Sequence, residues 1–133
     1  GANDLNVPIH LHLEQGGLST INYVLKVIRE LNVKENLIVI HHFPARHLNY
    51  VLNHNFWITI VGKLKELKIA VKFNCNLLIE SDFLDDPKRP GAVIPPWTIS
   101  KNWRKIINDG LCSIEDAIKI NVNNVLKLYS YLI

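Results

Sequence analysis

The feature that most constrains the fold of this chain is an alternation, repeated four times, between short apolar runs rich in β-branched residues and longer segments whose apolar residues recur with helical spacing. This alternation is typical of consecutive βα units, in which parallel strands form one sheet and the intervening helices cover it. The predicted strands are residues 7–13, 37–42, 56–61 and 77–82. The run 37–42 is almost continuously apolar, which indicates a central strand that is buried on both faces.

Helices are predicted between and after these strands. The first is expected to begin with Ser19 as its N-cap and to continue to Leu31. The proline-rich segment 83–96 is predicted to be an irregular loop. The remaining helices are expected over 45–53, 63–73, 100–109, from Ser113 onward and over 121–131, the last packed through Val122, Val125, Leu126 and Leu128.

The length of the chain limits it to a single domain, residues 1–133. Four units in 133 residues give about 33 residues each, and a (β/α)₈ TIM barrel of ~250 residues has ~31 per unit. The sequence therefore predicts an α/β fold that amounts to half of such a barrel. An open, four-stranded, doubly wound sheet fits the same pattern, although no glycine-rich phosphate loop follows the first strand.

Charge and cysteine content bear on the setting of the protein. A formal net charge of +3, from 15 Lys+Arg and 12 Asp+Glu, does not by itself indicate a surface for nucleic acid. The two cysteines form no disulfide framework and no apolar run is long enough to span a membrane, so we expect a cytoplasmic protein without a membrane partner. Because the chain starts at Gly1 and contains no methionine, we also expect it to be a fragment of a longer protein.

Polar side chains gather at the predicted ends of three strands. They are His10 and His12 in the first strand, His41 and His42 in the second, and Glu80 and Asp82 in the fourth. In parallel α/β folds the carboxyl ends of the strands form the edge where ligands and metals bind. Imidazoles and carboxylates that converge there suit a divalent cation such as zinc, with an open position for water. The alternative is that each histidine is an ordinary packed or exposed residue with a local hydrogen bond.

Two of these segments resemble strand motifs of the TatD-like metal-dependent hydrolases. Pro8-Ile9-His10-Leu11-His12 is similar to the fifth-strand motif of that family, which implies that His12 is a metal ligand. The segment 38–43 is similar to the sixth-strand motif, apolar residues followed by His-Cys-Phe. That match implies a second ligand at His41 and puts His42 where a cysteine is usual.

The resemblance continues through the second half of the chain. Residues 56–60 resemble the seventh strand, and 77–82 are similar to the eighth-strand motif Leu-Leu-Glu-Thr-Asp. The aspartate of that motif is a metal ligand that helps to activate water, which implies both roles for Asp82. The segment 82–91 is closest to an archaeal-type branch of the family. The match implies that the chain holds strands five to eight, the C-terminal half of the barrel, and that further family ligands lie N-terminal to it.

The resemblance also implies a cofactor and a set of supporting residues. The cofactor is a divalent metal, with zinc favoured over manganese or magnesium. His12, His41 and Asp82 are the expected ligands, and Asp82 is the expected catalytic base. Residues expected to support the ligands without being assigned as ligands are His10, Glu14, His42 and Glu80; at Glu14 the family usually has arginine.

Three functions follow as hypotheses. The first is a metal-dependent hydrolase of phosphodiester or related ester bonds, with nucleic acid as a candidate substrate, that is active when the N-terminal half-barrel completes it. The second is a catalytically inactive half-barrel that works as an oligomerising or interaction module, because four strands leave two open edges and an apolar inner face to be covered by a second copy or by the missing half. The third is a small α/β binding module with an incidental histidine cluster.

Overall fold

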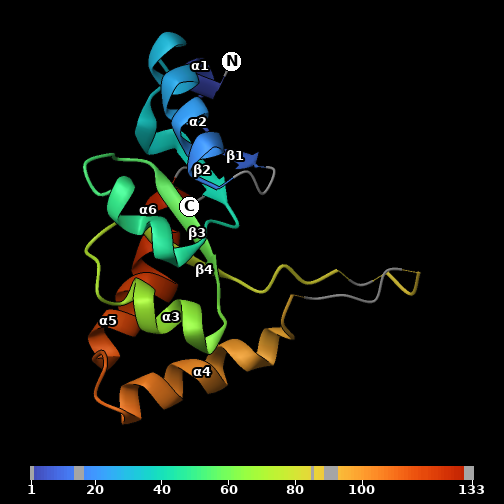
Figure 1. Ribbon diagram of the computed structural model, residues 1–133, viewed down its shortest axis with the longest axis vertical. Helices are drawn as coiled ribbons and strands as arrows, with labels where there is room; N and C mark the ends of the chain where they lie inside the picture. Colours follow the sequence, from blue (N-terminus) through green and yellow to red (C-terminus); the bar gives the residue numbers. More distant parts are fainter. Residues whose placement is uncertain (1, 14–16, 85, 89–92, 131–133) are drawn as a thin grey trace.

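A parallel sheet forms the centre of the computed structural model, which describes residues 2–13, 17–84, 86–88 and 93–130 (Figure 1). Its four strands lie in the order β1-β2-β3-β4 and every neighbouring pair is parallel. The strands are β1 (Ile9–His12), β2 (Ile38–His41), β3 (Trp57–Val61) and β4 (Leu77–Glu80). The predicted α/β class, the four strands and the central position of the second strand are confirmed, although each strand is shorter than expected.

Helical segments connect and follow the strands. They are α1 (Ala2–Leu5), α2 (Leu18–Glu30), the short 3-10 segments η1 (Glu35–Leu37) and η2 (Ala45–Tyr50), α3 (Leu64–Ala70), α4 (Pro96–Asn108), α5 (Ile114–Ile118), the π-helical segment η3 (Lys119–Asn123) and α6 (Asn124–Leu128). Among the described residues no helix combines the length and the apolar character needed to cross a bilayer.

Three predicted helix boundaries are wrong for local reasons. Ser19 is not the N-cap of α2, because Gly17 takes that place with a left-handed φ of 63° that glycine adopts at little cost. The segment 45–53 forms only the 3-10 segment η2, which ends at Tyr50. Helix α4 begins at Pro96, inside the predicted loop, because a proline in the first turn of a helix lacks only an N–H that would have no helical partner.

One face of the sheet carries the main core. Branched side chains of alternate strand positions point to this face and pack against the helices that connect and follow the strands. The cluster includes Ile40, Ile58 and Ile60 from the sheet, Ile21, Val24 and Ile28 from α2, Leu48 from η2, Leu67 from α3 and Ile106 from α4.

The opposite face is covered by the end of the chain. Val39, Trp57 and Leu78 are buried there against Leu128, and Tyr129 packs against the same cluster. The expectation of an uncovered inner face is therefore wrong for this part of the sheet, because the last helical turn lies over it.

The three segments α5, η3 and α6 run on from one another as a single helix along the outer edge of β4. Buried Asn124 donates a hydrogen bond from Nδ2 to the Leu77 carbonyl at 2.8 Å, which occupies an acceptor on that edge. The packing predicted for this helix is mostly wrong. Leu128 is buried, whereas its other expected contacts, Val122, Val125 and Leu126, are exposed.

Candidate functional site

His12 and His41 end neighbouring strands and lie side by side. β1 and β2 pair in register from Ile9 with Ile38 to His12 with His41. Because side chains of paired residues point to the same face of a sheet, the two imidazoles meet, with ring centroids 5.2 Å apart. The carboxyl-end edge of the sheet thus carries two adjacent imidazoles.

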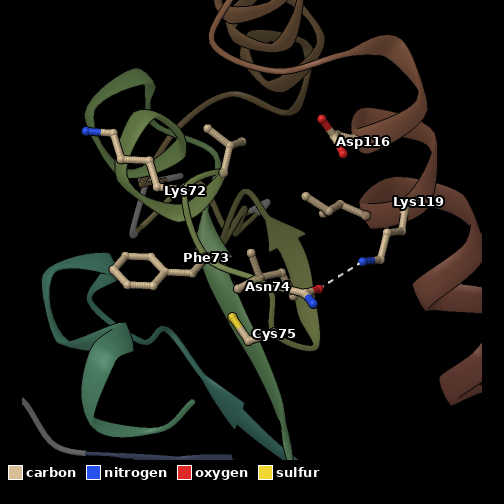
Figure 2. Close-up of a pocket in the computed structure, with 9 residues that line it drawn as sticks. Lys72, Phe73, Asn74, Cys75, Asp116 and Lys119 are labelled. Atoms are coloured by element: carbon tan, nitrogen blue, oxygen red, sulfur yellow. Dashed lines mark hydrogen bonds between the residues drawn. The ribbon is translucent and has the colours of Figure 1, made fainter.

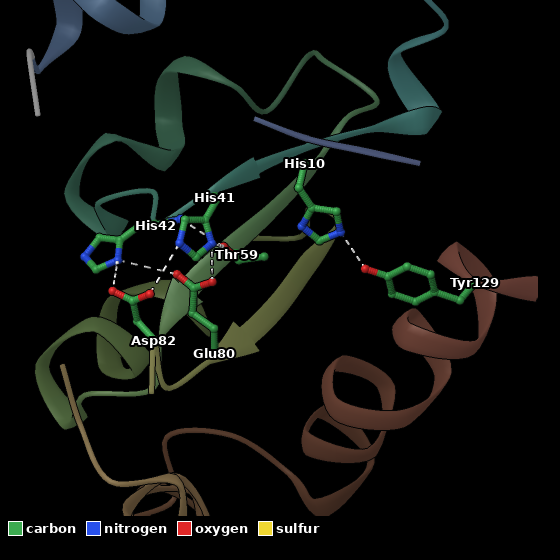
Figure 3. A network of polar contacts seen from close by, with 7 residues as sticks. All are labelled: His10, His41, His42, Thr59, Glu80, Asp82 and Tyr129. Carbon is green, nitrogen blue, oxygen red and sulfur yellow. Dashed lines mark hydrogen bonds and ion pairs between the residues drawn. The ribbon is translucent and has the colours of Figure 1, made fainter. Parts of the chain in front are cut away.

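His41 contacts both carboxylates from β4 and the residues that follow it (Figure 3). Its Nδ1 atom lies 2.7 Å from Glu80 Oε2, and its Nε2 atom lies 3.6 Å from Asp82 Oδ1. Thr59, a buried residue of β3, places its hydroxyl 3.5 Å from the same Nδ1 atom. Glu80 thereby fixes the orientation of the His41 ring and leaves Nε2 turned toward Asp82.

His42 joins the cluster through an unusual backbone conformation. Its φ is 59° and that of Asp82 is 53°, left-handed values that cost a non-glycine residue roughly 1–2 kcal/mol. The His42 N–H donates to Thr59 Oγ1 at 2.9 Å, and its Nδ1 atom lies 3.4 Å from Asp82 Oδ2 and 3.7 Å from Glu80 Oε1. Strained residues that face one another in this way are typical of functional sites.

The donor set fits a divalent cation. One ligand atom each from His41, His42 and Glu80 can be chosen so that all lie within 4.8 Å of one another. Among the described residues, Glu80 Oε1 is buried yet has no hydrogen-bond partner, which a cation would supply. Imidazole nitrogen and carboxylate oxygen together suit zinc and the harder manganese.

A cavity of about 350 Å³ opens at the cluster. His12, His41 and Asp82, the three residues predicted as metal ligands, all line it, whereas the group of described residues whose ligand atoms lie within 4.8 Å of one another is His41, His42 and Glu80. His42 and Lys63 line the same cavity. There is therefore room beside the candidate ligands for water and for part of a substrate.

Of the four residues predicted to support the ligands, two lie in the cluster and one is tied to the end of the chain. His10 Nε2 contacts the Tyr129 hydroxyl at 2.6 Å, so His10 is tied to the end of the chain. Burial lowers the pKa of His10, and nearby His41 lowers it further against an opposing effect of Glu80. Glu14 lies outside the described residues. Glu80 and His42 are both in the cluster.

Sequence reasoning missed Thr59, Lys63 and Tyr129. Thr59 could have been found, because a hydroxyl inside the otherwise apolar run of β3 needs a polar partner if it is buried. Lys63 directly follows Gly62 after the end of β3, the edge at which ligands bind in parallel sheets. Tyr129 gave no such signal, since it is 119 positions from His10.

A separate cavity of about 250 Å³ lies at the opposite end of β4 (Figure 2). Phe73, Asn74 and Cys75 line it from the segment before that strand, and Lys119 Nζ donates to Asn74 Oδ1 at 3.2 Å. Burial raises the pKa of the Cys75 thiol to about 11, so the thiolate is scarce near neutral pH. This cavity lies at the amino end of β4, and the histidine cluster lies at the carboxyl end. Its one thiol is unreactive, so the cavity is not part of the candidate site.

Comparisons with known proteins agree with the fold. A family model described as TatD related DNase matches residues 1–130. An uncharacterized protein of Methanocaldococcus jannaschii is 24% identical over 128 residues, which make up 96% of this chain and 45% of that protein. The crystal structure of the TatD-like protein of Archaeoglobus fulgidus superposes with a TM-score of 0.66 at 20% identity, covering 97% of this chain and 49% of that one. The chain thus spans about half the length of the relatives it matches.

Proposed function

The chain belongs to the TatD-related DNase family, and on that premise we propose that it supplies metal ligands and a catalytic base for the hydrolysis of phosphodiester bonds. The parallel four-stranded sheet matches the fold of a TatD-like barrel. We assign the chain to strands five to eight of a complete (β/α)₈ barrel of the archaeal type, so that the rest of the barrel adds ligands and closes the sheet. The coverage of about half of each relative supports this assignment.

Within this proposal, His12, His41 and Asp82 hold the metal, and His42 lies within reach of the same position. A divalent ion held by these residues would lower the pKa of a coordinated water toward ~7 and so would make that water a better nucleophile. Asp82 accepts the proton of the attacking water. Glu80 accepts a hydrogen bond from Nδ1 of His41, which keeps Nε2 free as a ligand atom. Zinc is the favoured metal for these ligands.

One observation carries the proposal: His41 lies between two carboxylates with different contacts. The Glu80 side chain is 15% exposed and touches Nδ1 at 2.7 Å, whereas the Asp82 side chain is 39% exposed, lies 3.6 Å from Nε2 and lines the open cavity. A less exposed carboxylate that orients a ligand imidazole and a more exposed one available to water are the parts that a metal hydrolase requires.

The test compares the parent chain with Asp82→Asn, each supplied with the other half-barrel, in a hydrolysis assay on a generic phosphodiester with zinc, manganese or magnesium. The amide keeps the shape of the side chain and loses its charge and basicity, so any hydrolysis by the parent should disappear. Asp86→Asn is the matched control, because the Asp86 side chain accepts from the Lys88 N–H and does not line the cavity. Turnover that Asp82→Asn leaves unchanged would refute the role of Asp82.

A second function, assembly, is favoured by an exposed apolar face on the last helices. A groove of about 680 Å³ lies between α4 and the helix that begins with α5. Large apolar side chains exposed along this helix and before it are Leu111, Ile114, Ile118, Val122, Val125 and Leu126. Three of them, Ile114, Ile118 and Val122, line the groove, and apolar surface gathered in this way is typical of an interaction site. We therefore propose that this face binds the other half of the barrel or a second copy of the chain.

Sedimentation at micromolar concentration tests the assembly. The parent should be at least dimeric or should bind an added N-terminal half-barrel, and Ile118→Asp should weaken either association. Ile118 is 47% exposed, so the substitution leaves the core intact. A parent that stays monomeric and ignores the added half would contradict the proposal.

A further inference from the structure

We infer that Lys63 and Arg46 form an anion-binding subsite beside the histidine cluster, which takes the phosphate next to the scissile one in a single-stranded polynucleotide. The inference rests on the proposed phosphodiester hydrolysis and adds a second contact to the same substrate. It is carried by the placement of Lys63, by two adjoining cavities and by the charges that line them.

The backbone at Lys63 is fixed at the carboxyl end of β3. The preceding residue, Gly62, donates its N–H to the Glu80 carbonyl at 2.9 Å and accepts from Asn102 Nδ2 at 2.8 Å through its own carbonyl. A Cβ atom at this glycine would lie 2.8 Å from Ile99 Cγ1, so any other residue would have to displace that side chain of α4. The Lys63 side chain therefore extends from a backbone whose position is fixed. It does so at the edge of the sheet where Asp82 also lies.

Lys63 borders two adjoining cavities. The first, of about 350 Å³, is the cavity of the histidine cluster. The second, of about 270 Å³, is lined by Arg46 and Glu66 among others. His42, Phe43 and Lys63 line both, so the two cavities meet along these side chains. A chain of phosphodiesters with one phosphate at the cluster can continue into the second cavity past Lys63.

The charges in the second cavity suit a singly charged anion. Lys63 and Arg46 are exposed, and neither forms an ion pair with another residue that the structure describes. Glu66 is the acidic residue of the lining, and its Oε2 atom accepts the Ala45 N–H at 2.8 Å. Two cations and one carboxylate leave one net positive charge, which matches an internal phosphodiester better than a doubly charged terminal phosphate.

Binding of a fluorescent single-stranded oligodeoxynucleotide, measured by anisotropy in the presence of a chelator, tests the subsite without hydrolysis. Lys63→Gln and Arg46→Gln should each weaken binding about three- to fivefold at low salt. Each should also reduce the slope of log K against log salt by about 0.7, the value for one phosphate contact on a single strand. Lys65→Gln is the matched control, since Lys65 is exposed two residues away and lines neither cavity.

Two further arms identify the phosphate. Replacing internal phosphates with uncharged methylphosphonates should remove the difference between the parent and Lys63→Gln, whereas removing the 5′-phosphate should leave that difference unchanged. The subsite is refuted if Lys65→Gln weakens binding as much as Lys63→Gln. Dependence on the terminal phosphate alone would overturn the assignment to an internal phosphodiester.

Zinc titration of Lys63→Gln separates this inference from the proposed function. The variant should bind zinc as the parent does, because Lys63 is not among the candidate ligands. If oligonucleotide binding depends on Lys63 but the metal-loaded protein, supplied with the other half-barrel, never hydrolyses a phosphodiester, then the proposed function fails and the subsite stands. If hydrolysis depends on Asp82 while Lys63→Gln binds the oligonucleotide as the parent does, only the subsite fails.

Discussion

Glu80→Gln is the substitution that best separates metal binding from folding in this protein. Glu80 Oε2 lies 2.7 Å from His41 Nδ1, while Glu80 Oε1 is buried and has no hydrogen-bond partner among the described residues. Glutamine has nearly the same shape and can still accept from Nδ1 through its carbonyl oxygen. It loses the negative charge that strengthens His41 as a ligand.

The substitution should lower metal affinity and leave stability without a loss. Replacing a carboxylate that orients a ligand histidine lowers metal affinity 10- to 100-fold, or about 1.4–2.7 kcal/mol. In the parent, the buried Oε1 atom without a hydrogen-bond partner lowers the free energy of unfolding by about 1–3 kcal/mol. The variant removes this oxygen, so the metal-free protein should lose no stability. The new amide can donate toward His42 Nδ1, which lies 3.7 Å from the present Oε1 position.

Zinc affinity is measured by calorimetric titration, and stability by urea unfolding with a chelator present. Glu115→Gln, the same change at an exposed position on α5, controls for net charge. Zinc binding by Glu80→Gln that equals that of the parent would refute the link between Glu80 and His41. A loss of stability without a loss of affinity would show that the carboxylate serves folding instead.

Two further predictions concern stability. Gly62→Ala should lower the free energy of unfolding by about 1–3 kcal/mol, because its Cβ would lie 2.8 Å from Ile99 Cγ1; a change within experimental error in urea unfolding would contradict this. Burial alone would raise the pKa of Glu35, but hydrogen bonds from the Asn55 N–H and the His54 ring lower it overall. Its stabilising contribution is therefore present above its ordinary pKa of 4.5 and lost as pH falls through the lower folded value. Glu35→Gln should make the fall in stability between about pH 5 and pH 3 shallower, and an unchanged slope would refute it.

The parts of the fold that the sequence predicted well are those governed by local periodicity. The four apolar runs became four parallel strands, and the continuous run around Val39 became a central strand with no exposed surface at that residue. Helix ends were predicted less well, because they depend on one or two residues. Gly17 replaced Ser19 as the cap of α2, and Pro96 began a helix inside a segment that proline had marked as a loop.

The burial of the last helix could not be predicted from its own pattern. Its apolar residues occur around most of its circumference, so spacing alone does not select the face that packs. Contacts with the sheet decide it, and they bury Ile120, Asn124 and Leu128 and leave Val122 and Leu126 exposed. Asn124 is buried because its side chain donates a hydrogen bond to a carbonyl at the edge of the sheet. A pattern of apolar residues alone does not predict a buried asparagine.

The contact between His41 and Glu80 depends on the stagger of the strands, which explains why the sequence predicted the candidate residues but not their pairing. Thr59 follows Ile58, which pairs with Ile40, so Thr59 lies opposite His41. Thr59 in turn pairs with Leu78, and Glu80 pairs with Val61. Glu80 is thus two residues nearer the carboxyl end than the row of His41, and a strand lies between them. The long side chain of Glu80 spans that offset and passes the small Thr59 hydroxyl. Asp82 lies two residues further on and has a shorter side chain, and its left-handed backbone brings that side chain to Nε2 of His41. The strain at Asp82 therefore follows from the same offset that lets Glu80 orient the imidazole.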